Sequence, residues 1–309
     1  MTRFIPMSSG IIGILLISFA AILMVKTDGV AQESKIFPYE INQVTLDNGL
    51  KIVSIPFPSP GIIAYYTVVR TGSRNEVEPG LSGFAHFFEH MMFRGTEKYN
   101  KEKFNDILKE MGADNNAFTS DDLTAYHTLA SSAALETIMD MEADRFMNLK
   151  YSVEDFKTEA GSILGEYNKS YSSPFMTMYE KLREAAYEKH TYKHTTMGFI
   201  KDILDMPNQY DYSIKFFDRW YRPENCVVVI VGDFDQTKLI DLAKKYYSNW
   251  KHGNYALQVP VEPPQKKEKI VNMTWKSKTL PMLAIGYHGA AFSTTDIDMP
   301  TLDIISQLT

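Results

Sequence analysis

The sequence predicts an α+β domain in which short hairpins are interrupted by helices. Alternating apolar segments joined by turn residues predict the hairpins, and longer stretches with apolar residues every three or four positions predict the helices. The steady alternation of strand and helix that builds a parallel sheet is not found. The hydrophobic content of 44% supports a sizeable core, and the net charge of −6 argues against a nucleic-acid partner.

Residues 1–31 are expected to be a signal peptide or a membrane anchor. Arg3 precedes an apolar run from Ile11 to Val25, and the small residues before position 32 are compatible with cleavage after Ala31. The run is about fifteen residues long, shorter than the roughly twenty that a spanning helix needs. A cleaved signal is therefore favoured, and an uncleaved anchor is the alternative. Either reading puts the folded part outside the cytoplasm, in the periplasm or anchored facing it.

The expected strands and helices can be placed along the chain from their turn and cap residues. Asp47-Asn48-Gly49 is a hairpin turn signal, and Gly112 closes a helix at the position that favours glycine. Ser152 is a plausible cap for a long helix, with Asp155 as a partial capping box. The expected strands are 44–46, 50–53, 62–70, 113–119, 123–130 and 226–231. The expected helices are 84–93, 101–111, 131–149, 153–171, 176–189, 208–220 and 237–250.

Three local features carry expectations of their own. Gly161 and Gly165 lie inside the long helix, and small residues there would allow close packing against another element. The segment from His190 to His194 contains and follows lysines, which predicts an exposed loop rather than a metal site. Cys226, the single cysteine, excludes an intrachain disulfide and is expected to be buried.

The C-terminal part of the chain predicts a second folding unit. Three prolines from Pro260 to Pro264 and the charged run Lys266–Lys269 mark a linker at 259–269. The linker follows a module at 36–258. It precedes residues 270–309, where a strand is expected at 282–287 and the chain stops inside what is expected to be the next helix.

The stretch from Gly83 to Phe93 carries the strongest chemical signal. His86 and His90 stand four residues apart on one face of the expected helix, and Glu89 lies beside them. Two imidazoles at this spacing can share one tetrahedral zinc ion, and the carboxylate could polarise a metal-bound water. The pattern H-x-x-E-H is the signature of the inverzincins. The alternative is a helix with two histidines bonded to the backbone and Glu89 paired with a cation.

A zinc site with two histidines needs a further protein ligand, and the long helix offers a carboxylate. Glu159 and Glu166 are two helical turns apart, so both fall on one face. Glu166 is the favoured ligand, with Glu159 as an outer partner that orients a ligand or the water. From spacing alone, a solvated helix face is the equal alternative.

Several blocks of sequence occur together with this motif. They are residues 72–76, 89–96, 116–119, 159–166, 220–225 and 229–233. With these blocks in this order the chain resembles the M16 (pitrilysin/insulinase) metallopeptidases, particularly their bacterial extracytoplasmic members. The resemblance covers residues 40–250 as one module and 270–309 as the start of a second, and it implies truncation at the C-terminus.

The resemblance implies a fold and a set of site residues. The fold is an antiparallel sheet with helices packed on it, similar to LuxS and related metalloproteases. His86, His90 and Glu166 are then the ligands of one Zn²⁺ per chain, with Glu159 in the second shell. Glu89 is then the catalytic base. In the family, substrate adds as a strand at an edge, which implies peptide binding along Asp114–Thr119, at Asn116 and Ala117.

The implied function is that of a zinc-dependent endopeptidase that hydrolyses extended or unfolded peptides through a zinc-activated water. The family pairs such a module with a second M16-like module, in the same chain or another, that supplies an Arg/Tyr pair for holding substrate. The sequence ends before any such pair. A non-catalytic interaction subunit, or one half of a two-subunit peptidase that is inactive alone, is the alternative.

Overall fold

The computed structural model describes residues 37–253, 255–256 and 258–308. The chain divides into two compact units, Met1–Tyr39 and Glu40–Thr309, and the description below concerns the larger one. The apolar run from Ile11 to Val25 lies outside the described residues. None of the helices in the described ranges combines the length and the apolar content needed to cross a bilayer.

A single sheet of six strands organises the larger unit, with the order β1-β2-β6-β3-β5-β4. All neighbouring strands are antiparallel except β2 and β6, which run parallel. The sheet is thus mixed, with one parallel pair that the hairpin pattern did not predict. The strands are β1 (Asn42–Thr45), β2 (Lys51–Pro56), β3 (Ile62–Val69), β4 (Asp114–Thr119), β5 (Thr124–Ser131) and β6 (Cys226–Gly232).

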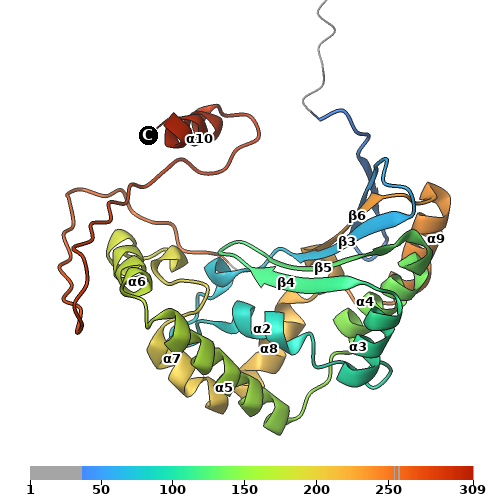
Figure 1. Cartoon of the computed structure of the whole chain (residues 1–309), viewed down its shortest axis with the longest axis horizontal. Coiled ribbons are helices and arrows are strands. Elements are labelled where there is room, and N and C mark those ends of the chain that lie inside the picture. The colour runs from blue at the N-terminus through green and yellow to red at the C-terminus, as the bar shows by residue number, and fades with distance from the viewer. Residues whose placement is uncertain (1–36, 254, 257, 309) are drawn as a thin grey trace, which may run out of the picture. The chain divides into compact units, whose positions relative to one another are not determined.

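Helices pack against one face of this sheet. In Figure 1, α2, α5 and α8 lie on the same side of the strands, with α3 and α4 nearer the other end of that face. The helices are α2 (Phe84–Met91), α3 (Lys101–Glu110), α4 (Leu135–Asn148), α5 (Val153–Ser170), α6 (Pro174–Ala186), α7 (Ile200–Asp205), α8 (Tyr210–Trp220), α9 (Gln236–Tyr247) and α10 (Asp298–Leu308). The observed architecture is therefore the expected α+β class.

The strand β6 lies between two strands that are close in sequence. It pairs with β2 on one side and β3 on the other, so that Val229 stands opposite both Val53 and Tyr66. Its alternate residues Cys226, Val228 and Ile230 are buried against the helices. The free Cys226 is part of this buried face, as predicted, and burial raises the pKa of its thiol well above the usual range.

Most expected elements are confirmed, with shifted ends. Ser152 caps α5 and forms a capping box with Asp155, as predicted. The helix expected from Ser131 begins at Leu135 instead, because the Ser131 hydroxyl caps a short 3₁₀ turn, Ser132–Ala134, that precedes it.

Two local predictions, on the glycines of α5 and on a strand at 282–287, are wrong. Gly161 and Gly165 face open space, since a Cβ on either would meet no atom within 4 Å. The buried side of α5 is instead formed by Phe156, Ala160 and Ile163. Residues 282–287 form no strand, because they have no described strand beside them to pair with.

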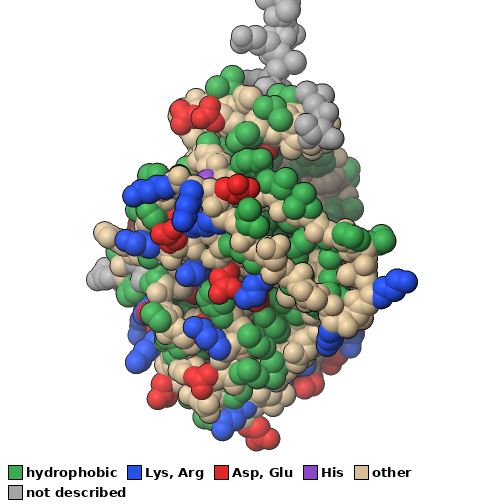
Figure 2. Space-filling view, turned by 90° about the vertical axis from the view of Figure 1, so that its left-hand side faces the viewer, with side chains coloured by type: hydrophobic (Ala, Val, Ile, Leu, Met, Phe, Trp, Pro, Cys, Tyr) green, Lys and Arg blue, Asp and Glu red, His purple; other side chains and the backbone are tan. Residues whose placement is uncertain are grey.

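The segment His190–His194 is also not the exposed loop that was predicted. It contains a 3₁₀ turn, and His194 is buried beside the carboxylate of Glu76. On the face shown in Figure 2, Lys and Arg side chains are interspersed with Asp and Glu side chains. The lysines at 189 and 193 did not reveal the burial of His194, because it depends on contacts with the distant segment around Glu76.

The start of α2 is fixed by a carboxylate from the preceding loop. Glu76 Oε2 accepts the N–H of Gly83, and Oε1 accepts the N–H of Ala85, both at 2.7 Å. Gly83 itself adopts a left-handed conformation and provides no side-chain cap. Since the side chain of Glu76 is fully buried, these two N–H groups have no access to water when the carboxylate is removed.

Replacing Glu76 by leucine is therefore expected to lower the free energy of unfolding by about 2 kcal/mol, because two buried donors lose their acceptor. Urea unfolding of the purified protein measures this loss. Glu110→Leu, at the exposed end of α3, is the matched control and should change stability little. Equal stability of the two variants would contradict the proposed role of Glu76.

Candidate metal centre

The helix α2 is held by aromatic packing on most of its surface. Phe88 stacks on Phe216 at 5.3 Å between ring centroids, and Phe87 contacts Phe156 of α5 at 5.0 Å. The hydroxyl of Tyr126 donates to the carbonyl of Phe88 at 3.0 Å. These contacts fix the rotation of the helix about its axis, so its remaining polar face, with His86 and His90, is turned toward α5.

The helix α5 presents its two glutamates to that face. Glu159 and Glu166 lie on the same side of α5, as their spacing predicted. Glu159 is buried, whereas the side chain of Glu166 is 48% exposed. One carboxylate is thus enclosed between the helices, and the other stands at the opening of the site.

Three of the predicted residues converge in a way that suits a metal. The Nε2 atom of His86 lies 3.4 Å from Glu166 Oε2, and Nε2 of His90 lies 3.6 Å from Glu166 Oε1. One ligand atom from each of the three residues falls within 4.8 Å of the others. Zinc with bonds of 2.0–2.1 Å in a tetrahedron separates its ligands by about 3.3 Å. The spacings therefore fit a zinc ion bound to both Nε2 atoms and to Glu166.

Burial and charge shift the pKa values of the two histidines in opposite directions, and the protonation of His86 fits that of a metal ligand. Burial lowers the pKa of His86 to about 4, an effect that the charge of His90 increases and that of Glu159 opposes. His86 is therefore neutral at pH 7, as a metal ligand must be. For His90, burial opposes the charged form, but the hydrogen bond to Glu159 and the charge of Glu166 raise the pKa.

Glu159 orients His90 and is itself held by an arginine. Its Oε1 lies 2.8 Å from Nδ1 of His90, so the N–H at Nδ1 donates to it and Nε2 is left for a metal. Its other oxygen accepts from Arg94, at 2.7 Å from Nε and also from Nη2. These hydrogen bonds, together with the charges of both partners, lower the pKa of Glu159 against the opposing effect of burial.

The formal charges of the site favour a divalent cation. Glu89, Glu159 and Glu166 carry three negative charges when ionised, and Arg94 neutralises one. Two negative charges remain around two imidazoles, which is the charge that Zn²⁺ would balance. This is a property of the donor set and does not depend on an ion being present.

Glu89 lies outside the three-residue group and is held from the sheet. Its Oε2 accepts a hydrogen bond from the hydroxyl of Thr119, at the end of β4, at 2.6 Å. Burial raises the pKa of Glu89, while Thr119 and the charge of His90 act in the opposite direction. A carboxylate held in this position beside the candidate ligands is placed to accept and return a proton.

The edge strand β4 contains the residues predicted to bind substrate. It pairs with β5 only, so its other edge is open among the described strands. Asn116 is exposed, and Ala117 is largely buried toward α2. The Asn116 side chain accepts the backbone N–H of Ala117 at 2.9 Å.

Two contacts of the candidate site were missed by sequence reasoning. Arg94 and Thr119 hold Glu159 and Glu89, respectively, across 65 and 30 positions of sequence. Both lie within blocks that carry the family resemblance, which is the signal that could have found them. His86 differs from His90, since its Nδ1 is buried without a hydrogen-bond partner in the described part of the chain.

Comparison with known proteins agrees with this fold and site. The family model described as Insulinase (Peptidase family M16) matches residues 62–199, and the one described as Peptidase M16 inactive domain matches residues 209–308. The matched class is thus that of peptidases, and relatives in it are named zinc proteases. The chain belongs to the M16 family.

Three relatives illustrate the similarity. Zinc protease PqqE of Helicobacter pylori is 31% identical over 95% of this chain and 66% of its own length. The crystal structure of a protease from Helicobacter pylori, 32% identical, superposes with a TM-score of 0.68 over 73% of this chain and 55% of that one. The crystal structure of the periplasmic protease PqqL from Escherichia coli is 26% identical and superposes with a TM-score of 0.64. The superposition covers 74% of this chain and 26% of that one. The chain spans 66% or less of each of these proteins.

The zinc content of the purified protein tests the proposed metal ligands. Purified protein is expected to contain about one zinc ion per chain, and His90→Ala should lose it because a ligand and its link to Glu159 both disappear. Metal analysis after dialysis measures the content. His252→Ala, a change at an exposed histidine outside the site, is the control and should keep the zinc. Wild-type protein without zinc would refute the assignment.

The role of Glu159 can be tested separately. Glu159→Gln keeps the shape but weakens the hydrogen bond that orients His90, so zinc affinity should fall by roughly ten- to a hundredfold without loss of the site. Competition with a chromogenic chelator measures the affinity. An affinity equal to that of the wild type would mean that Glu159 only fills space.

Proposed function

We propose that this chain carries the metal-binding module of a zinc endopeptidase that acts on extended or unfolded peptides. The observation that supports it most is the convergence of His86, His90 and Glu166 beside Glu89, which Thr119 holds in place. Relatives named zinc proteases support the same reaction class.

In the proposed reaction the residues of this chain have separate tasks. His86, His90 and Glu166 would hold a zinc ion, which when bound acidifies a water molecule and polarises a peptide carbonyl. Glu89 accepts a proton from the attacking water and returns it to the leaving nitrogen of the cleaved peptide. Thr119 keeps the Glu89 carboxylate turned toward the metal ligands, and Glu159 keeps His90 in the required tautomer.

The substrate is proposed to bind along β4. An extended peptide can add to the open edge of a sheet through backbone hydrogen bonds, which tolerate many side chains. Because Asn116 accepts the N–H of Ala117, a peptide that pairs at this position must displace the Asn116 side chain. Thr119 at the end of the same strand would bring that peptide next to Glu89.

A second module is the proposed partner. Apolar side chains after the linker are 75–88% exposed, namely Leu280, Leu283, Tyr287, Phe292 and Ile297. We infer that residues 270–309 begin this module and that more polypeptide, in the same chain or another, covers them. An extracytoplasmic location is proposed from the N-terminal apolar run, and it accords with the similarity to a periplasmic protease.

A second candidate function is that of an inactive partner. One matching family model is described as an inactive domain, and the chain spans only part of its relatives. The chain would then be an interaction subunit, or one half of a peptidase that is inactive alone. The presence of Glu89 together with all three candidate ligands favours the catalytic reading.

The decisive test is Glu89→Gln, which should keep zinc but abolish hydrolysis because an amide cannot accept the proton. Cleavage of a mixed pool of unstructured peptides is measured for the chain alone and with a second module added. The zinc content of the variant is the control. Substantial residual cleavage would make Glu89 a bystander, and loss of zinc would make it a ligand.

A further inference from the structure

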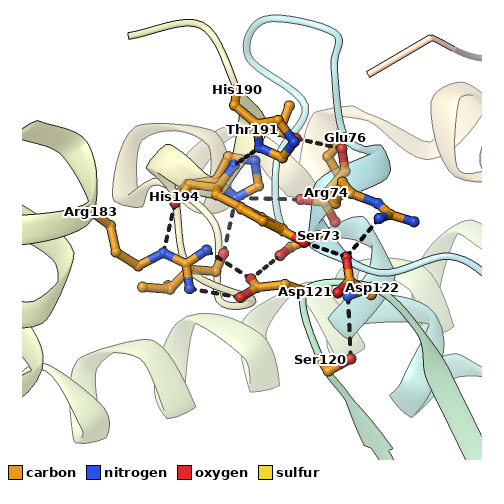
Figure 3. Close-up of polar contacts among 12 residues, drawn as sticks. Ser73, Arg74, Glu76, Ser120, Asp121, Asp122, Arg183, His190, Thr191 and His194 are labelled. Atoms are coloured by element: carbon orange, nitrogen blue, oxygen red, sulfur yellow. Dashed lines mark hydrogen bonds and ion pairs between the residues drawn. The ribbon is translucent and has the colours of Figure 1, made fainter. Parts of the chain in front are cut away.

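Three segments that are distant in sequence meet at one end of the edge strand. They are the β4–β5 turn at 120–123, the loop at 72–76 before α2, and the segment 183–192 that leads out of α6. Figure 3 shows Arg183 directed at Asp121 of the turn, with Ser73 beside it. None of these three residues belongs to the metal centre described above.

The contact between Arg183 and Asp121 is a bidentate ion pair. Nη1 donates to Oδ2 and Nη2 to Oδ1, both at 2.9 Å, while Nε donates to the carbonyl of Tyr192 at 2.7 Å. The side chains are only 11% and 31% exposed. A paired fork of this kind fixes orientation as well as distance, and partial burial protects it from screening by salt. We call this pair the turn anchor.

The loop before α2 fixes the same turn from the other side. Ser73 Oγ donates to Asp121 Oδ1 at 2.8 Å, and the N–H of Arg74 donates to the Asp121 carbonyl at the same distance. The backbones approach so closely that a Cβ on Gly72 would lie 2.3 Å from the carbonyl oxygen of Ser120. The turn therefore has one fixed position relative to the loop that leads into α2.

The position of this turn determines where β4 ends. Thr119 comes just before the turn, and its hydroxyl holds the carboxylate of Glu89. On the other side, Arg183 belongs to α6, which follows α5 after a short turn, and α5 carries Glu166. The turn anchor thus links the helix segment after one candidate ligand to the strand that holds the candidate base.

We propose that Arg183 and Asp121 are positioning residues for hydrolysis. They keep the end of β4 in the position from which the Thr119 hydroxyl can hydrogen-bond to Glu89. They touch neither a metal ligand nor Glu89 and act through the turn. This proposal rests on the proposed function, since Glu89 matters here as the proton acceptor. The same ion pair should also hold the end of β4 rigid, which can be tested without measuring activity.

The central experiment compares Arg183→Met with Lys181→Met, which removes an exposed ion pair on the same helix. Arg183→Met should lower kcat by about ten- to a hundredfold, the range expected for a misplaced catalytic group, with the zinc content unchanged. Lys181→Met should leave both unchanged. Thr119→Val should resemble Arg183→Met, and the double variant should be no worse than either single one, because both act on the same contact.

Hydrogen exchange gives the second readout. Amides at 114–124 should exchange faster in Arg183→Met, while those of α4 remain protected, and Arg183→Lys should recover part of the protection. Unchanged exchange in β4, or an unchanged kcat with normal zinc, would overturn the proposal. Losses of kcat that multiply in the double variant would also overturn it.

The two hypotheses can fail separately. If the wild type binds zinc but cleaves no peptide, either alone or with a second module added, the proposed function fails. Hydrogen exchange at 114–124 then still decides whether the turn anchor positions β4. If Arg183→Met does not fold, Asp121→Asn provides the same comparison with a smaller change in volume.

Discussion

The packing of α2 is the constraint on which the rest of the site depends. A helix of eight residues is marginal in water, because the free energy of so few hydrogen bonds hardly offsets the cost of nucleation. Its geometry is therefore imposed by tertiary contacts, through Phe84, Phe87 and Phe88, which are almost completely buried. The distance between the two imidazoles is thus a property of the core and not of the helix alone.

The two histidines are held by different physical means. His90 is oriented by a hydrogen-bonded chain through Glu159 to Arg94, so its position follows charge and directional bonds. His86 has no such partner at Nδ1 among the described residues, and its ring is held by packing and by an edge-to-face contact with His90 at 4.9 Å. Changes in the core should therefore affect His86 first, and changes in charge should affect His90 first.

The sequence was informative where a pattern is local and weak where contacts are distant. The hairpins and the common face of Glu159 and Glu166 follow from periods of two and 3.6 residues, and the cap of α5 follows from the hydrogen-bonding side chains of Ser152 and Asp155. The parallel β2–β6 pair, the role of Thr119 and the burial of His194 depend on segments that meet only in the folded chain. The prediction for Gly161 and Gly165 was wrong for the same reason, because small residues in a helix do not indicate which side of it packs against a neighbouring element. The candidate ligands could be named before any geometry was known, His86 and His90 from the H-x-x-E-H pattern and Glu166 from the block 159–166.

The place of β6 in the sheet has a consequence for how the chain folds. β2 and β3 are separated by a short loop, yet they cannot become neighbours, because β6 has to enter between them from a part of the chain made much later. Such non-local pairing slows folding and leaves open edges until it is complete. During synthesis, the β1–β2 and β4–β5 hairpins therefore form before β6 (Cys226–Gly232) is available. Until then the strands that will flank β6 have unpaired backbone groups and exposed valines and tyrosines. The strand order thus makes closure of the sheet a late step that needs nearly the whole of residues 42–232.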